Sequence, residues 1–156
     1  RKAIIFSNWR KVTDRYFEAL SDFQPAYIHG DIPPKERQEA ADRFQNDEKC
    51  SLIIGTIGAM GTGLTLNAAS YVIFVDKSWV PADNEQAEDR AHRIGTRGTV
   101  NVITLTAKGT IDEYIEKHIK ERKAAFSYFV ETETAEAIRS SDILLDFLRY
   151  AKKEEL

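Results

Sequence analysis

The sequence predicts an α/β domain in which a mostly parallel sheet lies between two layers of helices. Short apolar runs recur along residues 3–106, and segments with helical periodicity separate them. The runs at residues 3–6, 52–55 and 72–76 are continuous rather than alternating, as expected of parallel strands that helices cover on both faces. This alternation is typical of a three-layer domain with right-handed crossovers, in which binding residues gather at the carboxyl ends of the strands.

Each expected element follows from its own residues. The strands are expected at residues 3–6 (AIIF), 26–29 (AYIH), 52–55 (LIIG), 72–76 (VIFVD) and 100–106 (VNVITLT). A helix over residues 9–20 places four apolar side chains on one face: Val12, Tyr16, Phe17 and Leu20. A second helix over residues 33–47 begins with prolines, which suit a first helical turn, and buries Ala40, Ala41 and Phe44.

The pattern becomes wholly helical after Gly109. The tetrapeptide TIDE at 110–113 predicts a capping box, with Thr110 as the N-cap and Glu113 reaching back to it. Apolar residues at helical spacing then predict a helix to about Val130. One or two further helices are expected over residues 132–156.

Composition restricts the class of protein. The chain has 156 residues, which favours one domain, but it begins with Arg1 and its only methionine is Met60, so we expect a segment of a longer protein. It contains no signal peptide and no apolar run near the roughly 20 residues that span a bilayer. A single cysteine, Cys50, excludes an internal disulfide, and three scattered histidines do not predict a zinc site. An intracellular location is favoured.

The charge of the chain is nearly balanced. The net charge is −3, and residues from Glu131 onward carry seven acids and four bases, whereas residues 1–130 hold eighteen of each. The overall charge therefore does not indicate a nucleic-acid partner, and any such partner must bind a local patch.

A glycine-rich loop follows the third strand, GTIGAMGTG at residues 55–63. Gly58 and Gly63 have the spacing of a phosphate-binding P-loop, but Leu64 stands where that loop has its lysine, ahead of Thr65. The spacing of a dinucleotide-binding fingerprint is also absent. The alternatives are therefore a tight strand-to-helix turn and a phosphate-facing loop of another kind.

The strand VIFVD ends in Asp76, as the magnesium-binding strand of many ATPases does. Lys77 follows it, where an ATPase usually has the glutamate that activates water. Asp76 is therefore interpreted as a structural or coupling residue rather than a magnesium ligand. The chain has no complete phosphate-binding machinery of its own.

Arginines gather in the segment NEQAEDRAHRIGTRG, residues 84–98. On a helix over residues 84–94, Gln86, Arg90 and Arg93 fall at positions i, i+4 and i+7 of one face. An ordinary charged surface helix, with Asp89 paired to Arg93, is the alternative. Because Arg90 has no acid four residues away, we favour phosphate binding, with the arginines offered to a nucleotide held elsewhere, as arginine fingers are.

The same segment, EQAEDRAHRIG, closely resembles motif VI of the Swi/Snf family of DNA-dependent ATPases, in helicase superfamily two. The family's other elements follow in order: motif IV at 2–9 (KAIIFSNW), the HG-to-Arg element at 28–44, motif V with its Asp-x-x-Trp segment at 52–81, and the closing helix at 106–123. The resemblance covers residues 2 to about 125.

The resemblance implies a second RecA-like lobe, with residues 1–109 as its core and residues 110–156 as a helical extension that packs on this lobe or on the N-terminal lobe. ATP and Mg would be held mainly by that N-terminal lobe, which carries the Walker motifs. The implied partners are the N-terminal lobe of the same protein and the backbone of double-stranded DNA. The implied location is a bacterial cytoplasm or a nucleus.

The resemblance also assigns nucleotide-binding residues. It implies that Arg90 and Arg93 reach the ATP phosphates, with Arg93 as the finger, and that Gln86 supports the same surface. Gly63 and Thr65 match the part of motif V that lies near the ribose.

Further residues match DNA-binding and coupling positions. Ser7 and Thr56, at strand ends, match positions that contact the DNA phosphate backbone, which fixes position without reading sequence. His29, Gly30 and Arg37 match the element between motifs IV and V, although His29 can also be a satisfied strand-end residue and Arg37 a salt-bridged helical one. Asp76 and Trp79 match coupling positions, and a packed core tryptophan is the alternative for Trp79.

This chain departs from the family's pattern at three places. It has GLTL for Gly-Leu-Asn-Leu, WVP for Trp-Asn-Pro and RIGT for Arg-Ile-Gly-Gln, and each change removes an amide side chain. GLT together with AKGT is more similar to the annealing-helicase branch and its bacterial members than to nucleosome remodellers. The expected function is the C-terminal motor lobe of an ATP-dependent DNA translocase; the alternative is a non-catalytic nucleic-acid-binding or scaffold module.

Overall fold

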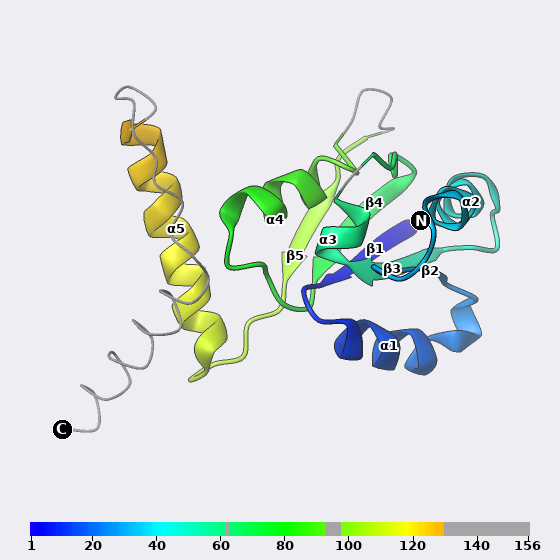
Figure 1. The fold of residues 1–156 in the computed structure, drawn as a ribbon, viewed down its shortest axis with the longest axis horizontal. Coiled ribbons are helices and arrows are strands. Elements are labelled where there is room, and N and C mark those ends of the chain that lie inside the picture. Colours follow the sequence, from blue (N-terminus) through cyan, green and yellow to red (C-terminus); the bar gives the residue numbers. More distant parts are fainter. Residues whose placement is uncertain (62, 93–97, 130–156) are drawn as a thin grey trace. The chain divides into compact units, whose positions relative to one another are not determined.

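The computed structural model describes residues 1–61, 63–92 and 98–129 (Figure 1). The chain divides into two compact units. The first comprises residues 1–78 and 82–105, and the second comprises residues 79–81 and the segment from Thr106 onward. Each unit is described by itself.

The first unit is built on a five-stranded sheet. Its strands are β1 (Lys2–Ser7), β2 (Ala26–Ile28), β3 (Leu52–Thr56), β4 (Ala69–Phe74) and β5 (Asn101–Thr104). They are ordered β2-β3-β1-β4-β5, and every pairing is parallel. The carboxyl ends of all five strands therefore lie at one edge of the sheet. The predicted α/β class and parallel sheet are confirmed.

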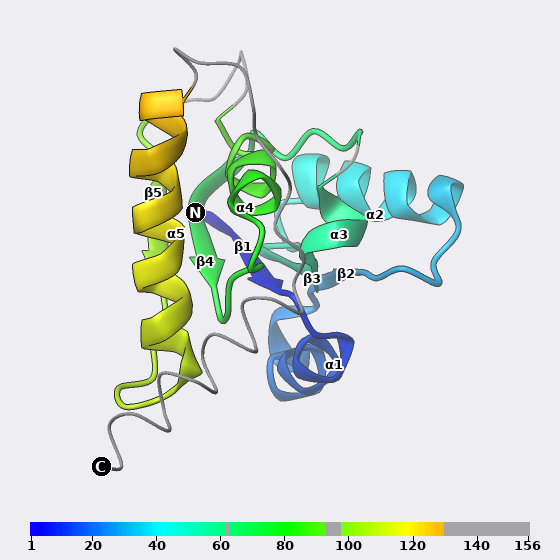
Figure 2. The same cartoon turned by 60° about the vertical axis from the view of Figure 1, so that its left-hand side comes forward.

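Helices cover the sheet as the crossovers require. They are α1 (Arg10–Ala19), followed by a 3₁₀ turn (Ser21–Phe23), α2 (Pro34–Asn46), the short α3 (Ile57–Met60) and α4 (Pro81–Glu88). The step from β1 to β2 runs in the opposite direction to the later steps, so right-handed crossovers place α1 on one face and α2 to α4 on the other. Figure 2 shows α1 on one side of the strands and α2 and α3 on the other.

The core is built around the central strand β1. Phe6 has no exposed surface, and its ring stacks on that of Phe74 with centroids 5.3 Å apart. Phe44 of α2 and Ile53 of β3 are equally buried. Burial of these apolar side chains supplies the main driving force for folding and fixes the sheet edge on which polar residues sit.

The helix predicted over residues 84–94 is placed wrongly. It begins three residues earlier, at Pro81, and ends at Glu88. Beyond it, the amide nitrogens of Arg90 and Ala91 donate to Ala87 O (3.2 Å) and Glu88 O (3.0 Å), three residues back. Arg90 therefore lies in the turn after the helix rather than on the predicted helix. Arg93 lies outside the described residues.

The second unit contains the long helix α5 (Ile111–Phe129), close to the predicted span. Its predicted cap is confirmed with one difference. The amide of Asp112 donates to Thr110 Oγ1 (3.2 Å), but Glu113 reaches back to the amide of Gly109 (3.1 Å) rather than to that of Thr110. The helices expected over residues 132–156 lie outside the described residues, and the packing of the extension stays a prediction.

In the part of the chain that the structure describes, no helix has both the length and the apolar character needed to cross a bilayer.

Candidate functional site

The carboxyl edge of the sheet brings together residues that are far apart in the sequence. Ser7 ends β1 and lies opposite Thr56, which ends β3. His29 follows β2, and Asp76 follows β4 by two residues. Four of the predicted site residues therefore share one edge, as the parallel topology requires.

Ser7 and Asp76 join the ends of β1 and β4. The Ser7 side chain has 0% exposure, and its hydroxyl donates to Asp76 Oδ2. Asp76 Oδ1 accepts from the amide of Asn8 (2.7 Å), and the amide of Trp9 donates to Ser7 Oγ (3.0 Å). Asp76 therefore has a structural role, because it joins the ends of β1 and β4. The Ser7 hydroxyl is hydrogen-bonded within the protein, and its DNA contact stays a prediction.

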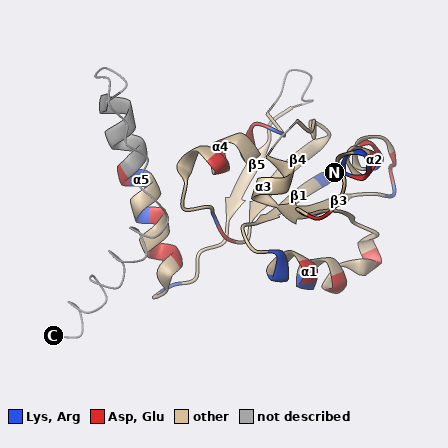
Figure 3. Cartoon of the chain, viewed as in Figure 1, with Lys and Arg blue, Asp and Glu red and all other residues tan. Residues whose placement is uncertain are grey.

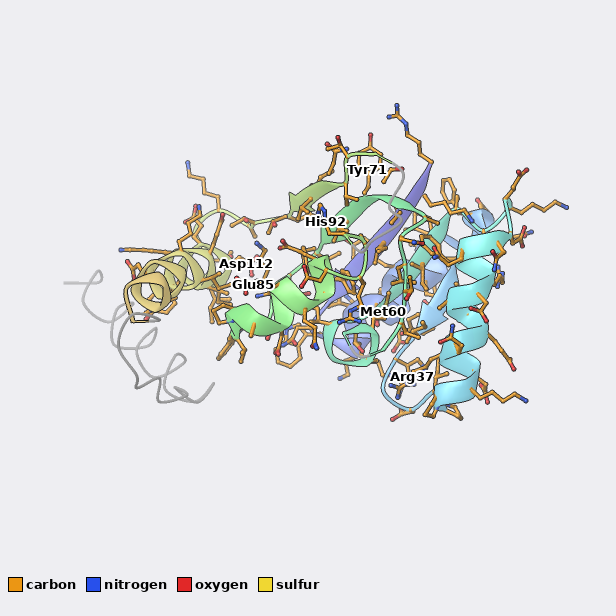
Figure 4. All side chains as sticks on the ribbon, turned by 90° about the horizontal axis from the view of Figure 1, so that it is seen from above. Arg37, Met60, Tyr71, Glu85, His92 and Asp112 are labelled. Atoms are coloured by element: carbon orange, nitrogen blue, oxygen red, sulfur yellow. The ribbon has the colours of Figure 1, made fainter. Side chains whose placement is uncertain are left out.

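Arg37 holds the turn that follows β2. Its Nε donates to Ile32 O and its Nη2 to Gly30 O, each at 2.6 Å. The side chain lies near the start of α2 (Figure 4), so one guanidinium pins two carbonyls of the turn. Arg37 is thus bound to backbone oxygens rather than to the helical carboxylate that was the alternative. Gly30 itself is exposed.

His29 is half-buried against the same turn. Its Nδ1 accepts from the amide of Asp31 (3.3 Å), and its ring is tilted against that of Tyr27, with centroids 5.1 Å apart. These contacts fit the strand-end interpretation of His29. The DNA-binding role of this residue, like those of Gly30 and Arg37, stays a prediction.

A polar cluster behind this turn has no counterpart in the sequence analysis. The Tyr27 hydroxyl donates to Asp14 Oδ1 and lies 2.9 Å from Thr13 Oγ1. Arg10 contacts both Asp14 (3.8 Å) and Asp31, which ties α1 to the turn. Burial, followed by the hydrogen bond to Asp14, raises the pKa of Tyr27 above its usual value. The signal that could have found the cluster is the i,i+4 spacing of Arg10 and Asp14.

The glycine loop approaches the sheet closely at one end and is open at the other. A Cβ at Gly55 would overlap Ile28 O and the sulfur of Met60, so only glycine fits there. Gly63 has a φ of +75° and no atom within 4 Å of its Cβ position. The loop does contain the tight turn that was one alternative, since α3 begins at Ile57 directly after β3.

The open end of the loop is held by α4 and by the turn after it. Gln86 Oε1 lies 3.3 Å from the Cβ position of Gly61. Arg90 is 7% exposed, and its guanidinium donates to Gln86 O (Nε, 3.1 Å) and Leu64 O (Nη1, 3.4 Å). The amide of Leu66 donates to Arg90 O (3.0 Å). The structure thus brings Gln86 to Gly61 of the glycine loop, and Arg90 to Leu64 and Leu66, which flank the half-buried Thr65 just after the loop.

Asn84 is another residue to which the sequence analysis assigned no role. It is buried, and its side chain makes two hydrogen bonds with the backbone of Ser78, accepting from the amide and donating to the carbonyl, both at 2.8 Å. This pair fixes the start of α4. Trp79, the other predicted coupling residue, is half-buried, and its coupling role stays a prediction.

The helices α1 and α2 carry charged residues of both signs. Figure 3 shows Lys and Arg interspersed with Asp and Glu on α1 and α2. This agrees with the balanced charge of residues 1–130. No group of three or more His, Cys, Asp and Glu side chains that could hold a metal ion occurs in residues 1–61, 63–92 and 98–129.

Comparison with known proteins places this fold and its motifs in a family. The model of the helicase conserved C-terminal domain matches residues 1–95. The chain belongs to this family. The matched region contains the sheet edge, the glycine loop and the arginines at 90 and 93.

The relatives of this helicase C-terminal domain are SWI/SNF-related. It is 37% identical over 123 residues to the SWI/SNF-related matrix-associated actin-dependent regulator of chromatin subfamily A-like protein 1 of Xenopus laevis, covering 78% of this chain and 13% of that protein. It is 39% identical over 113 residues to the DNA annealing helicase and endonuclease ZRANB3 of Mus musculus, covering 71% and 11%. Over 152 residues it is 34% identical to the ATP-dependent helicase FUN30 of Saccharomyces cerevisiae, covering 94% and 13%.

A solved structure supports the same conclusion. The crystal structure of the C-terminal part of the Fun30 ATPase domain matches with a TM-score of 0.78 and 29% identity, covering 99% of this chain and 48% of that one. The RecA-like lobe implied by the sequence motifs is confirmed. The chain spans only about an eighth of the length of the relatives described above.

Proposed function

We propose that this helicase C-terminal domain is the second motor lobe of an ATP-dependent double-stranded-DNA translocase. Closure against an N-terminal lobe with Walker motifs would place the arginine segment on the nucleotide, and repeated closure would step the lobe along the DNA backbone. The observation that carries the proposal is the hydrogen bond from Arg90 to Leu64 O, because it brings Arg90 to the residue that directly follows the glycine loop.

We expect this chain to supply only one side of the nucleotide-binding site. Gly63 is exposed and no atom lies within 4 Å of its Cβ position, which supports a ribose contact at this backbone. Leu64 replaces the lysine of a P-loop, and the described residues offer no cluster of metal ligands. ATP and Mg would therefore be held mainly by the other lobe, where Mg neutralises phosphate charge during hydrolysis, and this chain would add Gln86, Gly63, Thr65 and the arginines.

DNA is proposed to lie along the carboxyl edge of the sheet. Thr56 is half-buried there, and Trp9 next to Ser7 is 57% exposed. Contacts from hydroxyl and amide groups to phosphate oxygens would fix the position of the lobe without reading sequence. A DNA motor of this kind works in a nucleus or a bacterial cytoplasm.

The decisive experiment is Arg93→Ala in the protein that carries both lobes. A missing finger leaves the transition-state charge unstabilised, so DNA-stimulated ATP turnover should fall by roughly 10³-fold while DNA affinity is nearly retained. Arg97→Ala, from the same segment, is the matched control and should keep most of the turnover. Near-normal ATPase in Arg93→Ala would instead favour the non-catalytic binding module.

A further inference from the structure

We propose that Arg10 is a phosphate-binding residue that Asp31 covers while DNA is absent, and that a phosphate of the duplex takes the place of Asp31 when DNA binds. This inference rests on the proposed function and adds one charged contact to it. The sequence analysis assigned no role to either residue. Their ion pair, which only the folded chain brings together, is the observation that carries the inference.

The Arg10–Asp31 pair lies at the edge of the sheet where DNA is proposed to bind. Arg10 is the first residue of α1, three residues after the end of β1, and Asp31 lies three residues after the end of β2. Between these two strands lies β3, which ends at Thr56, a predicted phosphate contact. The pair therefore joins the two segments that flank the strand of Thr56.

Two acids hold different parts of the Arg10 guanidinium. Its Nη1 donates to Asp31 Oδ2, and its Nε lies 3.8 Å from Asp14 Oδ2. Asp14 also accepts from the Tyr27 hydroxyl, which ties it to β2. When Asp31 is displaced, Asp14 still holds the Arg10 side chain at this edge, and Nη1 becomes available to another anionic oxygen.

The ion pair is open to competition. The side chains of Arg10 and Asp31 are 51% and 74% exposed, and ion pairs between such groups contribute little to stability because water and salt screen them. A guanidinium binds phosphate with the same planar fork that it presents to a carboxylate. The first turn of α1 contains Arg10 and Lys11 and no acid, and Figure 3 shows this start of the helix in blue. Asp31 is therefore an internal competitor that weakens the hold on DNA and eases its release.

The variant Asp31→Asn, in the protein that carries both lobes, tests the competition. The amide keeps the shape of the side chain but removes its charge, so Arg10 is freed. The dissociation constant for duplex DNA should fall by about two- to fivefold, the size expected for release of an exposed ion pair. Glu39→Gln is the matched control, because it removes the same charge from the exposed Lys35–Glu39 pair within α2, and it should leave the affinity nearly unchanged. Fluorescence anisotropy of a labelled duplex measures both.

A double-mutant cycle tests whether Asp31 acts through Arg10. Arg10→Ala should weaken DNA binding by about two- to tenfold, because a charged hydrogen bond to phosphate is lost. The plot of log affinity against log salt should become shallower by about 0.9, as the loss of one neutralised phosphate requires. In the Arg10→Ala background, Asp31→Asn should have no more effect than Glu39→Gln.

Three outcomes would overturn the inference and leave the proposed function intact. They are equal effects of Asp31→Asn and Glu39→Gln, a gain from Asp31→Asn that persists in the Arg10→Ala background, and an Arg10→Ala variant with unchanged affinity and salt slope. A parent protein without affinity for duplex DNA would overturn the proposed function as well.

Arg10→Lys covers the case in which Arg10→Ala does not fold. A lysine keeps the charge but replaces the guanidinium fork with a single ammonium group, so part of the affinity should be lost while the salt slope is retained. Denaturant titration checks that each variant is folded, and because both side chains of the pair are exposed, its removal should change stability little. An Arg10→Lys variant with the parent's full affinity would contradict a contact made by the guanidinium fork.

Discussion

At the scale of single residues, several polar side chains of the candidate site bond to the protein itself. Ser7 donates to Asp76, Arg37 to the carbonyls of the turn after β2, and Arg90 to Leu64 O. Each of these bonds fixes a loop at the edge of the sheet. These residue types fit phosphate binding, but in the folded chain their side chains hold the backbone of neighbouring loops in position.

Tyr27 makes the stability of the fold depend on pH in the alkaline range. Because burial and Asp14 raise its pKa, the folded chain disfavours the phenolate more than the unfolded chain does. The stabilisation is fully present below about pH 10, the usual tyrosine pKa, and is lost as the pH rises through the folded pKa. Denaturant unfolding followed from pH 8 to 11 should show this loss.

Tyr27→Phe is the matching variant. It should lower the free energy of unfolding by about 1 kcal/mol at pH 8, where the hydrogen bonds to Asp14 and Thr13 are lost, and should lose less additional stability above pH 10. An equally steep alkaline decline in the variant would mean that another group titrates there.

Gly55 permits the close contact between β2, β3 and α3. A Cβ at this position would overlap the backbone oxygen of Ile28, which cannot move without disturbing the sheet. Gly55→Ala should therefore lower the free energy of unfolding by about 1–3 kcal/mol, the usual range for overpacking. Gly58→Ala is the control, since no atom lies within 4 Å of its Cβ position and it sits in α3. The interpretation fails if both variants are equally stable.

At the scale of elements, α4 shows where pattern reasoning stops. Its residues fit a helix over 84–94 by spacing, but Pro81 suits the first helical turn and the observed helix occupies 81–88. The end is set by a change to hydrogen bonds three residues back at Arg90 and Ala91. Side-chain periodicity carries no signal for that change, so Arg90 was predicted on a helix that ends two residues before it, at Glu88.

Asn84 should anchor α4. Its removal leaves the buried amide and carbonyl of Ser78 without their side-chain partner, so Asn84→Ala should lower the free energy of unfolding by about 2–3 kcal/mol in denaturant titration. Asn46→Ala loses one exposed hydrogen bond to Asp42 O and should change stability by less than about 0.5 kcal/mol. A similar loss in the two variants would show that Asn84 has no special role.

At the scale of the whole molecule, the sequence predicts what depends on local pattern. Buried strands are continuous apolar runs, and the parallel order then places Ser7, Thr56 and Asp76 at one edge. The α5 cap was predictable because all its partners lie within five residues of one another. Asp76 lies 69 residues from Ser7 and Leu64 lies 26 residues from Arg90, so only the folded chain shows these two contacts.

The balanced charge of the lobe leads to a prediction about DNA binding. Residues 1–130 contain eighteen acids and eighteen bases, and Figure 3 shows them interspersed on α1 and α2. Hydroxyl and amide contacts release no counterions, so this chain should neutralise few phosphates. The logarithm of the DNA association constant falls with the logarithm of the salt concentration, with a slope of about −0.9 per neutralised phosphate. For this chain on duplex DNA, that slope should be shallower than about −3.

Fluorescence anisotropy at several salt concentrations measures that slope. Two duplexes of equal length and scrambled sequence should give the same slope and nearly the same affinity, because backbone contacts carry no sequence information. A slope near −6 would require a dense basic surface that the interspersed charges do not provide, and a strong preference for one duplex would require base contacts. Either result would contradict a lobe that follows the DNA backbone through uncharged contacts.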